Sequence, residues 1–137
     1  MRSAACRAVR ELLLDKGDEE IMSLIEELEQ LGANVEEAMG RFMDNAELYE
    51  RMLKRLPDAV EKAQVKAAFD AKDHDAAEKG AHALKGVAGN LALDALFENY
   101  SKIVEQLREG KTAEAAELYE KTLEIESPIV ECIKKHL

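Results

Sequence analysis

Hydrophobic residues recur every three or four positions along this chain, and no segment keeps the strict alternation of a half-buried β-strand. A period near 3.6 residues predicts an all-α protein. The segments that carry this period, and are therefore predicted as helices, are residues 3–16, 18–31, 34–42, 44–72, 73–91, 94–109 and the segment from 112 onward.

Capping residues indicate where several of these helices begin. Asn34 is followed by Glu37 three residues later, as in a capping box. Asp73 and Thr112 are predicted to cap the helices that follow them, because a side-chain oxygen can accept from the free backbone N–H groups of a first helical turn.

Two prolines are expected to disturb helices. Pro57 should kink segment 44–72 or split it in two, since proline lacks a backbone donor and clashes with the preceding turn. Ser127 and Pro128 predict a bend in the last helix.

Short connections organise the predicted helices. Only a few residues join them around 91–94 and 109–112, so consecutive helices are expected to run antiparallel. We therefore predict an antiparallel up-down four-helix bundle over residues 33–137. An N-terminal extension with one or two more helices covers residues 1–32, with the boundary near Gly32.

Charge and composition exclude several partners. The net charge of the 137 residues is −10, and residues 17–50 alone hold eleven acids and one base. An acidic chain disfavours nucleic acid and anionic membranes as partners. No apolar run reaches the length of a spanning helix, and the N-terminus lacks the apolar segment of a signal peptide. A cytoplasmic location is therefore expected.

The two cysteines, Cys6 and Cys132, are expected to be free thiols in a reducing compartment. Neither belongs to a CxxC motif, and neither is expected to have a histidine at metal-ligand spacing. Cys132 lies between apolar positions of a helical pattern and is predicted to fill the core.

The most informative helix is 73–91, which contains two of the three histidines. On a helical wheel its small and apolar residues share one face: Ala77, Ala81, Leu84, Ala88 and Leu91. His82 falls on the opposite face, which is expected to be exposed. Gly86 and Gly89 follow it on that face, while Lys85 and Glu78 lie on the shoulder.

Two glycines beside an exposed histidine suggest a function. Each costs a helix about 0.8–1 kcal/mol relative to alanine. Because both are predicted to face water, the space they leave should serve a molecule that approaches His82 from outside. A neutral imidazole can attack phosphorus, and Lys85 can balance charge on a transferring phosphoryl group. Glu78, one turn before His82, can accept a hydrogen bond from its other ring nitrogen.

Simpler interpretations of these residues stay open. A single exposed histidine on a helix is most often inert, and His74 and His136 are expected to be so. Glu78 and His82, four residues apart, could also bind a metal in a helical enzyme. No second pair of this kind was identified, so no metal site is predicted.

The sequence AHALKGVAGNL at residues 81–91 resembles the signature of the histidine phosphotransfer (HPt) domain family. The resemblance covers about residues 33–137, and residues 1–31 have no clear counterpart. It implies a four-helix bundle that presents one reactive histidine. His82 would be the phosphoryl acceptor and Lys85 its charge partner. Gly86, Gly89 and Glu78 would provide the clearance and docking surface for the partner.

The resemblance also implies partners and limits. Such domains exchange a phosphoryl group with an aspartate of a response-regulator receiver domain, or act beside a hybrid histidine kinase. They have no kinase activity of their own. The Mg²⁺ belongs to the receiver, so no cofactor is expected here, and the chain is expected to be a monomer. The alternative is a non-catalytic HPt-like interaction module.

Overall fold

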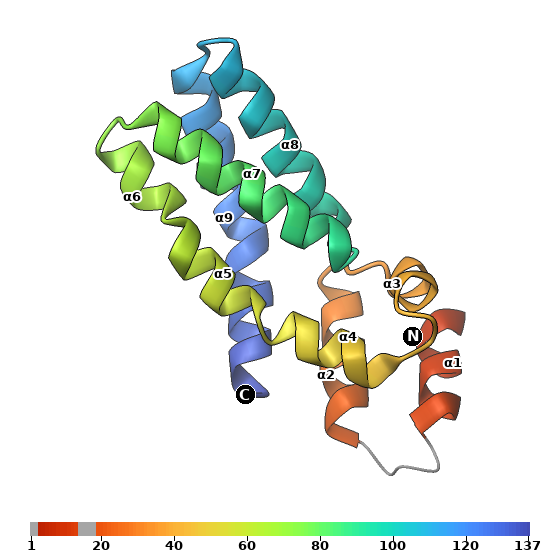
Figure 1. Cartoon of the computed structure of the whole chain (residues 1–137). Coiled ribbons are helices and arrows are strands. Elements are labelled where there is room, and N and C mark those ends of the chain that lie inside the picture. The colour runs from red at the N-terminus through yellow and green to blue at the C-terminus, as the bar shows by residue number, and fades with distance from the viewer. Residues whose placement is uncertain (1–2, 14–18) are drawn as a thin grey trace.

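The computed structural model describes residues 3–13 and 19–137 (Figure 1). Every regular element in this part of the chain is a helix, which confirms the all-α prediction. The helices are α1 (Ala4–Leu13), α2 (Glu19–Gln30), α3 (Val35–Arg41), α4 (Ala46–Leu53), α5 (Leu56–Ala63), α6 (Val65–Asp70), α7 (His74–Asn90), α8 (Asp94–Arg108) and α9 (Thr112–Lys135). The predicted boundary between segments 3–16 and 18–31 lies outside the described residues.

Two of the three predicted caps are confirmed. The side chain of Asn34 accepts from the backbone N–H of Glu37, and that of Asp73 accepts from the N–H of Ala76. The third prediction is wrong, because Thr112 is the first residue of α9 and Lys111 occupies the cap position without a side-chain hydrogen bond.

Segment 44–72 is divided into three helices rather than two. Pro57 lies in the first turn of α5, where its missing N–H costs little. A second break follows at Gln64, whose φ of +48° interrupts the helical path before α6 begins. In contrast, α9 continues through Pro128 as one helix.

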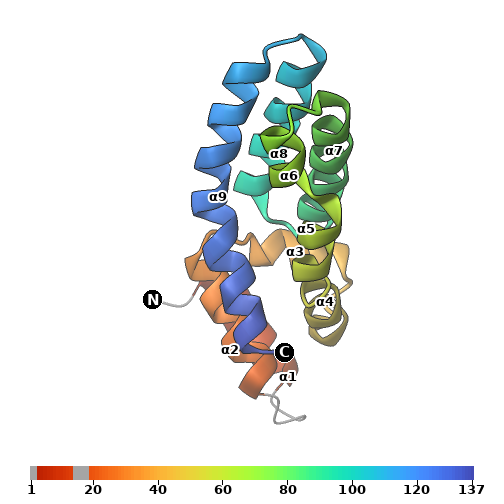
Figure 2. The ribbon, with the colours of Figure 1, turned by 90° about the vertical axis from the view of Figure 1, so that its left-hand side faces the viewer.

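The longest helices pack side by side (Figures 1 and 2). α7 lies along α8, and α8 along α9, with successive helices running in opposite directions. α5 and α6 together cover another side of α7, and α5 also contacts α9. α1 and α2 contact α4, and α2 lies beside the C-terminal half of α9 (Figure 2). Buried side chains from α1–α4 and from α5–α9 form one hydrophobic core.

Three hydrogen bonds fasten the N-terminal helices to the turn between α7 and α8. The backbone N–H of Asn34 donates to the Ala92 carbonyl at 2.9 Å, and its side-chain Nδ2 donates to Asp94 at 3.1 Å. The buried hydroxyl of Tyr49 donates to the Leu91 carbonyl at 2.9 Å. The C-terminal end of α7 is therefore held by residues of the N-terminal helices as well as by α8, the helix that follows it.

The inward face of α9 contains polar as well as apolar residues. Leu118 and Ile125 are only half-buried. The buried residues of α9 are Ala115, Tyr119, Thr122, Glu126, Ile129, Cys132 and Ile133. Glu126 is 3% exposed and accepts a short hydrogen bond from the hydroxyl of Tyr100. Burial raises the pKa of this carboxyl, and the bond from Tyr100 opposes that rise only in part.

We predict that Glu126→Gln stabilises the protein at neutral pH. A carboxyl whose pKa is raised by folding contributes stability below its unfolded-state pKa, and this is lost as the pH rises through the folded-state value. Glutamine resembles the protonated acid and avoids the loss. Urea unfolding from pH 4 to pH 7 should show the variant gaining on the wild type as the pH rises. A difference that is constant with pH would contradict this account.

Candidate functional site

Helix α7 buries one stripe of residues and exposes the other. Ala77, Ala81, Leu84 and Ala88 are buried, as the wheel predicts. His82 is exposed on the opposite side, also as predicted. The imidazole therefore stands on the outer surface of a 17-residue helix whose ends are held by the Asp73 cap and by the bonds at Leu91 and Ala92.

Gly80 has a packing role that the sequence reasoning missed. It is buried, and a Cβ atom there would lie 2.5 Å from the Ala63 carbonyl oxygen and 2.8 Å from a Val65 methyl group. The absent side chain lets α7 approach the junction between α5 and α6. Gly80 lies on the same face of the helical wheel as Leu84, and this position indicates that it is buried.

The two glycines expected to provide clearance are not equivalent. A Cβ atom at Gly86 would meet nothing within 4 Å, so the backbone there is open to an approaching molecule. A Cβ atom at Gly89 would lie 3.1 Å from the ring of Phe97 on α8. Phe97 therefore occupies part of the space at Gly89, which the sequence analysis left wholly to an approaching molecule.

Lys85 and Glu78 are both directed toward α8. Lys85 is half-buried, with its Nζ 5.9 Å from the centroid of the Phe97 ring, a cation–π arrangement. Glu78 accepts a hydrogen bond from Arg108 Nε at 2.9 Å. The expectation that Glu78 bonds the ring of His82 is thus not met here, since Arg108 takes its carboxylate.

Two hollows adjoin α7. One, of about 500 Å³, is lined by Lys85, Gly86, Gly89 and residues of α3 and α8. The other, of about 900 Å³, lies toward α5 and has an apolar floor that includes Phe42, Met52, Val87 and Leu91. Its basic residues are Arg41, Arg55 and Lys62, with Asp58 as the acid among them.

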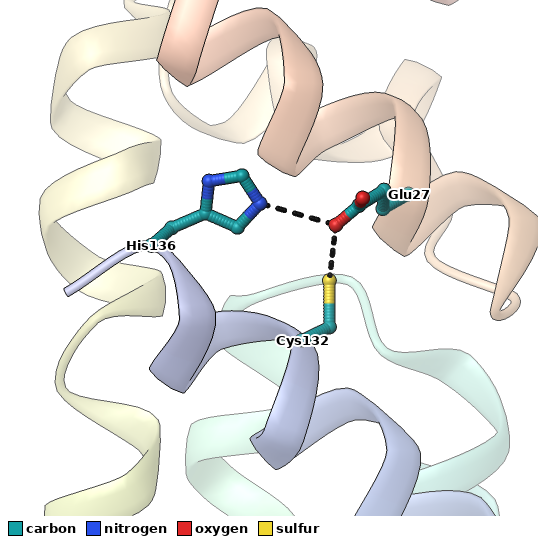
Figure 3. A group of neighbouring side chains, drawn as sticks. All are labelled: Glu27, Cys132 and His136. Atoms are coloured by element: carbon teal, nitrogen blue, oxygen red, sulfur yellow. Dashed lines mark hydrogen bonds and ion pairs between the residues drawn. The ribbon is translucent and has the colours of Figure 1, made fainter.

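The remaining histidines lie apart from His82 in the fold. His74 begins α7 and is half-buried. His136, expected to be inert, contacts Glu27 of α2 with its Nε2 3.1 Å from the carboxylate. Cys132 donates from its thiol to the same carboxylate oxygen at 3.2 Å (Figure 3).

This cluster corrects two sequence expectations. Cys132 is buried, as predicted, but its thiol also has a polar partner. It does have a histidine at metal-ligand spacing, because His136, the C-cap residue of α9, follows Cys132 by four residues. Hydrogen bonds from His136 and Cys132 lower the pKa of Glu27, whereas burial raises the pKa of the Cys132 thiol to about 11.

Comparison with known proteins gives no match: no family model, no curated protein and no solved structure is significantly similar to the chain. None of the helices in the described part of the chain is long and apolar enough to cross a membrane.

We predict opposite effects from adding one methyl group at Gly80 and at Gly86. Gly80→Ala should lower the free energy of unfolding by about 1–3 kcal/mol, because backbone and side-chain atoms occupy the space. Gly86→Ala should raise it by about 0.5–1 kcal/mol, because alanine favours the helix and nothing is displaced. Urea unfolding of both variants checks this. Equal effects would show that the contact with Ala63 does not limit the packing of α7.

Proposed function

We propose that this chain is a histidine-containing phosphotransfer protein of a two-component phosphorelay, with His82 as its phosphoryl acceptor. In this proposal α5 with α6, α7, α8 and α9 form the four-helix bundle of an HPt domain. The observation that carries the proposal is the exposed imidazole of His82 next to open backbone at Gly86, on a helix held firmly at both ends.

The reaction is a reversible exchange with a receiver aspartate. A ring nitrogen of neutral His82 attacks the phosphorus of an aspartyl phosphate, a P–N bond forms and the P–O bond to the carboxyl oxygen breaks. The aspartate leaves as a carboxylate, and the imidazole releases the proton of its other nitrogen to solvent. The receiver supplies the Mg²⁺, so this chain needs no cofactor, nucleotide pocket or kinase activity.

Lys85 is the residue best placed to assist this step. It lies one helical turn after His82, and its contact with the Phe97 ring limits the positions that its ammonium group can take. A cation held there stabilises the charge on the transferring phosphoryl group. Glu78 is neutralised by Arg108, which reduces its repulsion of an incoming phosphate.

The surroundings of α7 suit a protein partner. The larger hollow combines apolar floor residues with the basic side chains of Arg41, Arg55 and Lys62. This combination favours a partner with an acidic rim around an apolar patch, such as a receiver domain whose active site is rich in carboxylates. We propose that the chain acts as a cytoplasmic monomer that meets such partners transiently.

Phosphate labelling tests the acceptor. Response-regulator receiver domains charged with labelled acetyl phosphate should transfer phosphate to the wild-type chain, giving an acid-labile, alkali-stable product. His82→Gln should lose the label, because glutamine has no nucleophilic ring nitrogen. His74→Gln is the matched control from the same helix and should keep it. Equal labelling of His82→Gln and the wild type would remove His82 from the mechanism.

Graded bulk at Gly86 tests the clearance. Gly86→Leu should fold normally, since the position is open, but should accept phosphate at least tenfold more slowly because its side chain stands where the receiver approaches. The transfer rate of Gly86→Ala should lie between those of Gly86→Leu and the wild type. Circular dichroism reports the fold, and phosphate labelling stopped at successive times reports the transfer rate. Normal transfer by Gly86→Leu would refute the clearance argument.

The alternative is an interaction module without phosphate chemistry, which the apolar floor and basic residues of the larger hollow would serve equally well. Calorimetry with an unphosphorylated receiver separates the two. Binding that is retained in His82→Gln while no variant accepts phosphate would favour the module.

A further inference from the structure

We propose that Glu27, Cys132 and His136 form a zinc-binding site that joins α2 to the C-terminal end of α9. The site is independent of His82 and of the proposed phosphotransfer. It uses one carboxylate from α2, a thiol from the last turn of α9 and the imidazole of the C-cap residue that follows that turn (Figure 3). Among the described residues, this is the group of three such side chains close enough to share one ion.

The distances are close to those that a tetrahedral ion requires. Zinc bonds of about 2.0–2.3 Å to oxygen, nitrogen and sulfur place neighbouring ligand atoms about 3.3–3.6 Å apart. Here one oxygen of Glu27 lies 3.2 Å from Cys132 Sγ and 3.1 Å from His136 Nε2. All three ligand atoms lie within 4.8 Å of one another. Small side-chain rotations would therefore bring them around a common ion.

The kinds of ligand identify the class of metal. Thiolate and imidazole favour Zn²⁺ and related transition metals, whereas Mg²⁺ and Ca²⁺ prefer a shell made of oxygen atoms. Three protein ligands leave a fourth tetrahedral position for water. When zinc binds, the thiol loses its proton to solvent and the sulfur–metal bond replaces the hydrogen bond to Glu27.

The site is accessible without being fully exposed. Cys132 is buried and the side chain of His136 is 16% exposed, but that of Glu27 is 41% exposed and gives an ion a path from solvent. A cation also lies beside the site: the Nζ of Lys135 is 3.9 Å from the Glu27 carboxylate. Its side chain is 67% exposed, so it can turn away into water when an ion occupies the site.

The other cysteine provides an internal comparison. Cys6 of α1 is also buried, and burial together with the neighbouring carboxylate of Glu29 raises the pKa of its thiol to about 11. Among the described residues, no histidine lies close enough to Cys6 and Glu29 to share an ion with them. If a buried thiol beside a glutamate were sufficient to bind metal, Cys6 would bind metal as well. We expect binding only at Cys132, where His136 supplies a third ligand.

Cobalt titration of the full-length, tag-free, reduced protein tests the site, since Co²⁺ occupies zinc sites and reports a thiolate ligand by its charge-transfer absorption. The wild type should bind one Co²⁺ with this absorption and with the intense visible bands of tetrahedral cobalt. Addition of Zn²⁺ should displace it. Thermal unfolding with and without Zn²⁺ should show a higher Tm in the presence of the metal.

Three variants and one control identify the ligands. Cys132→Ser keeps a donor for Glu27 but should abolish the thiolate absorption. His136→Ala and Glu27→Gln should each weaken Co²⁺ binding at least tenfold and remove the rise in Tm. Cys6→Ser should bind as the wild type does. Should Cys132→Ser be unfolded, His136→Ala at the C-cap of α9 decides the matter by the same two measurements.

Absence of thiolate absorption in the wild type at millimolar Co²⁺ would overturn the proposal. So would absorption that survives Cys132→Ser or is lost in Cys6→Ser, or metal binding unchanged by His136→Ala. In those cases the three side chains form only a hydrogen-bonded clamp between α2 and α9. Phosphate transfer to His82 is expected to be the same in all of these variants, with or without metal. The zinc proposal and the phosphotransfer proposal can therefore fail separately.

Discussion

Close packing of α7 against α5, α6 and α8 is the constraint on which the rest of this structure depends. Small residues on the buried face let neighbouring helices approach, to the point that a single added carbon at Gly80 would meet the Ala63 carbonyl. Since that face cannot turn outward without exposing Leu84 and opening cavities, the opposite face is fixed in turn. His82 and Gly86 are exposed because the small residues behind them are buried.

Much of this could be predicted from the sequence, because the period of a helix relates residues that are close along the chain. The all-α class, the caps at Asn34 and Asp73, the buried stripe of α7 and the exposure of His82 all follow from local spacing. The break at Gln64 could not be predicted in this way. Its positive φ belongs to a residue with no strong preference for that conformation, so the packing around it must impose it.

Contacts between distant segments explain the remaining errors. The helical pattern leaves the space at Gly89 entirely to a partner, because nothing in its own helix shows that the Phe97 ring lies against it. Local spacing pairs Glu78 with His82, four residues away, whereas the structure pairs it with Arg108, thirty residues away. Cys132 and His136 are separated from Glu27 by more than one hundred residues, and only the pair on α9 left a signal in the sequence.

The acidic N-terminal segment acquires a structural meaning from these contacts. Several of its carboxylates are engaged: Glu26 with Arg10, Glu27 with the end of α9, and Glu37 with the cap of α3 and Arg41. The contacts of Glu26 and Glu27 position α2, and α2 leads within four residues to Asn34, whose backbone and side chain hold the turn at Ala92 and Asp94. That turn ends α7 and begins α8, and so sets Phe97 against Gly89 and Lys85. A continuous set of contacts thus connects the Glu27 cluster to the neighbourhood of His82. The position of His82 nevertheless does not depend on the Glu27 cluster, because α7 is packed through its own contacts with α5, α6 and α8.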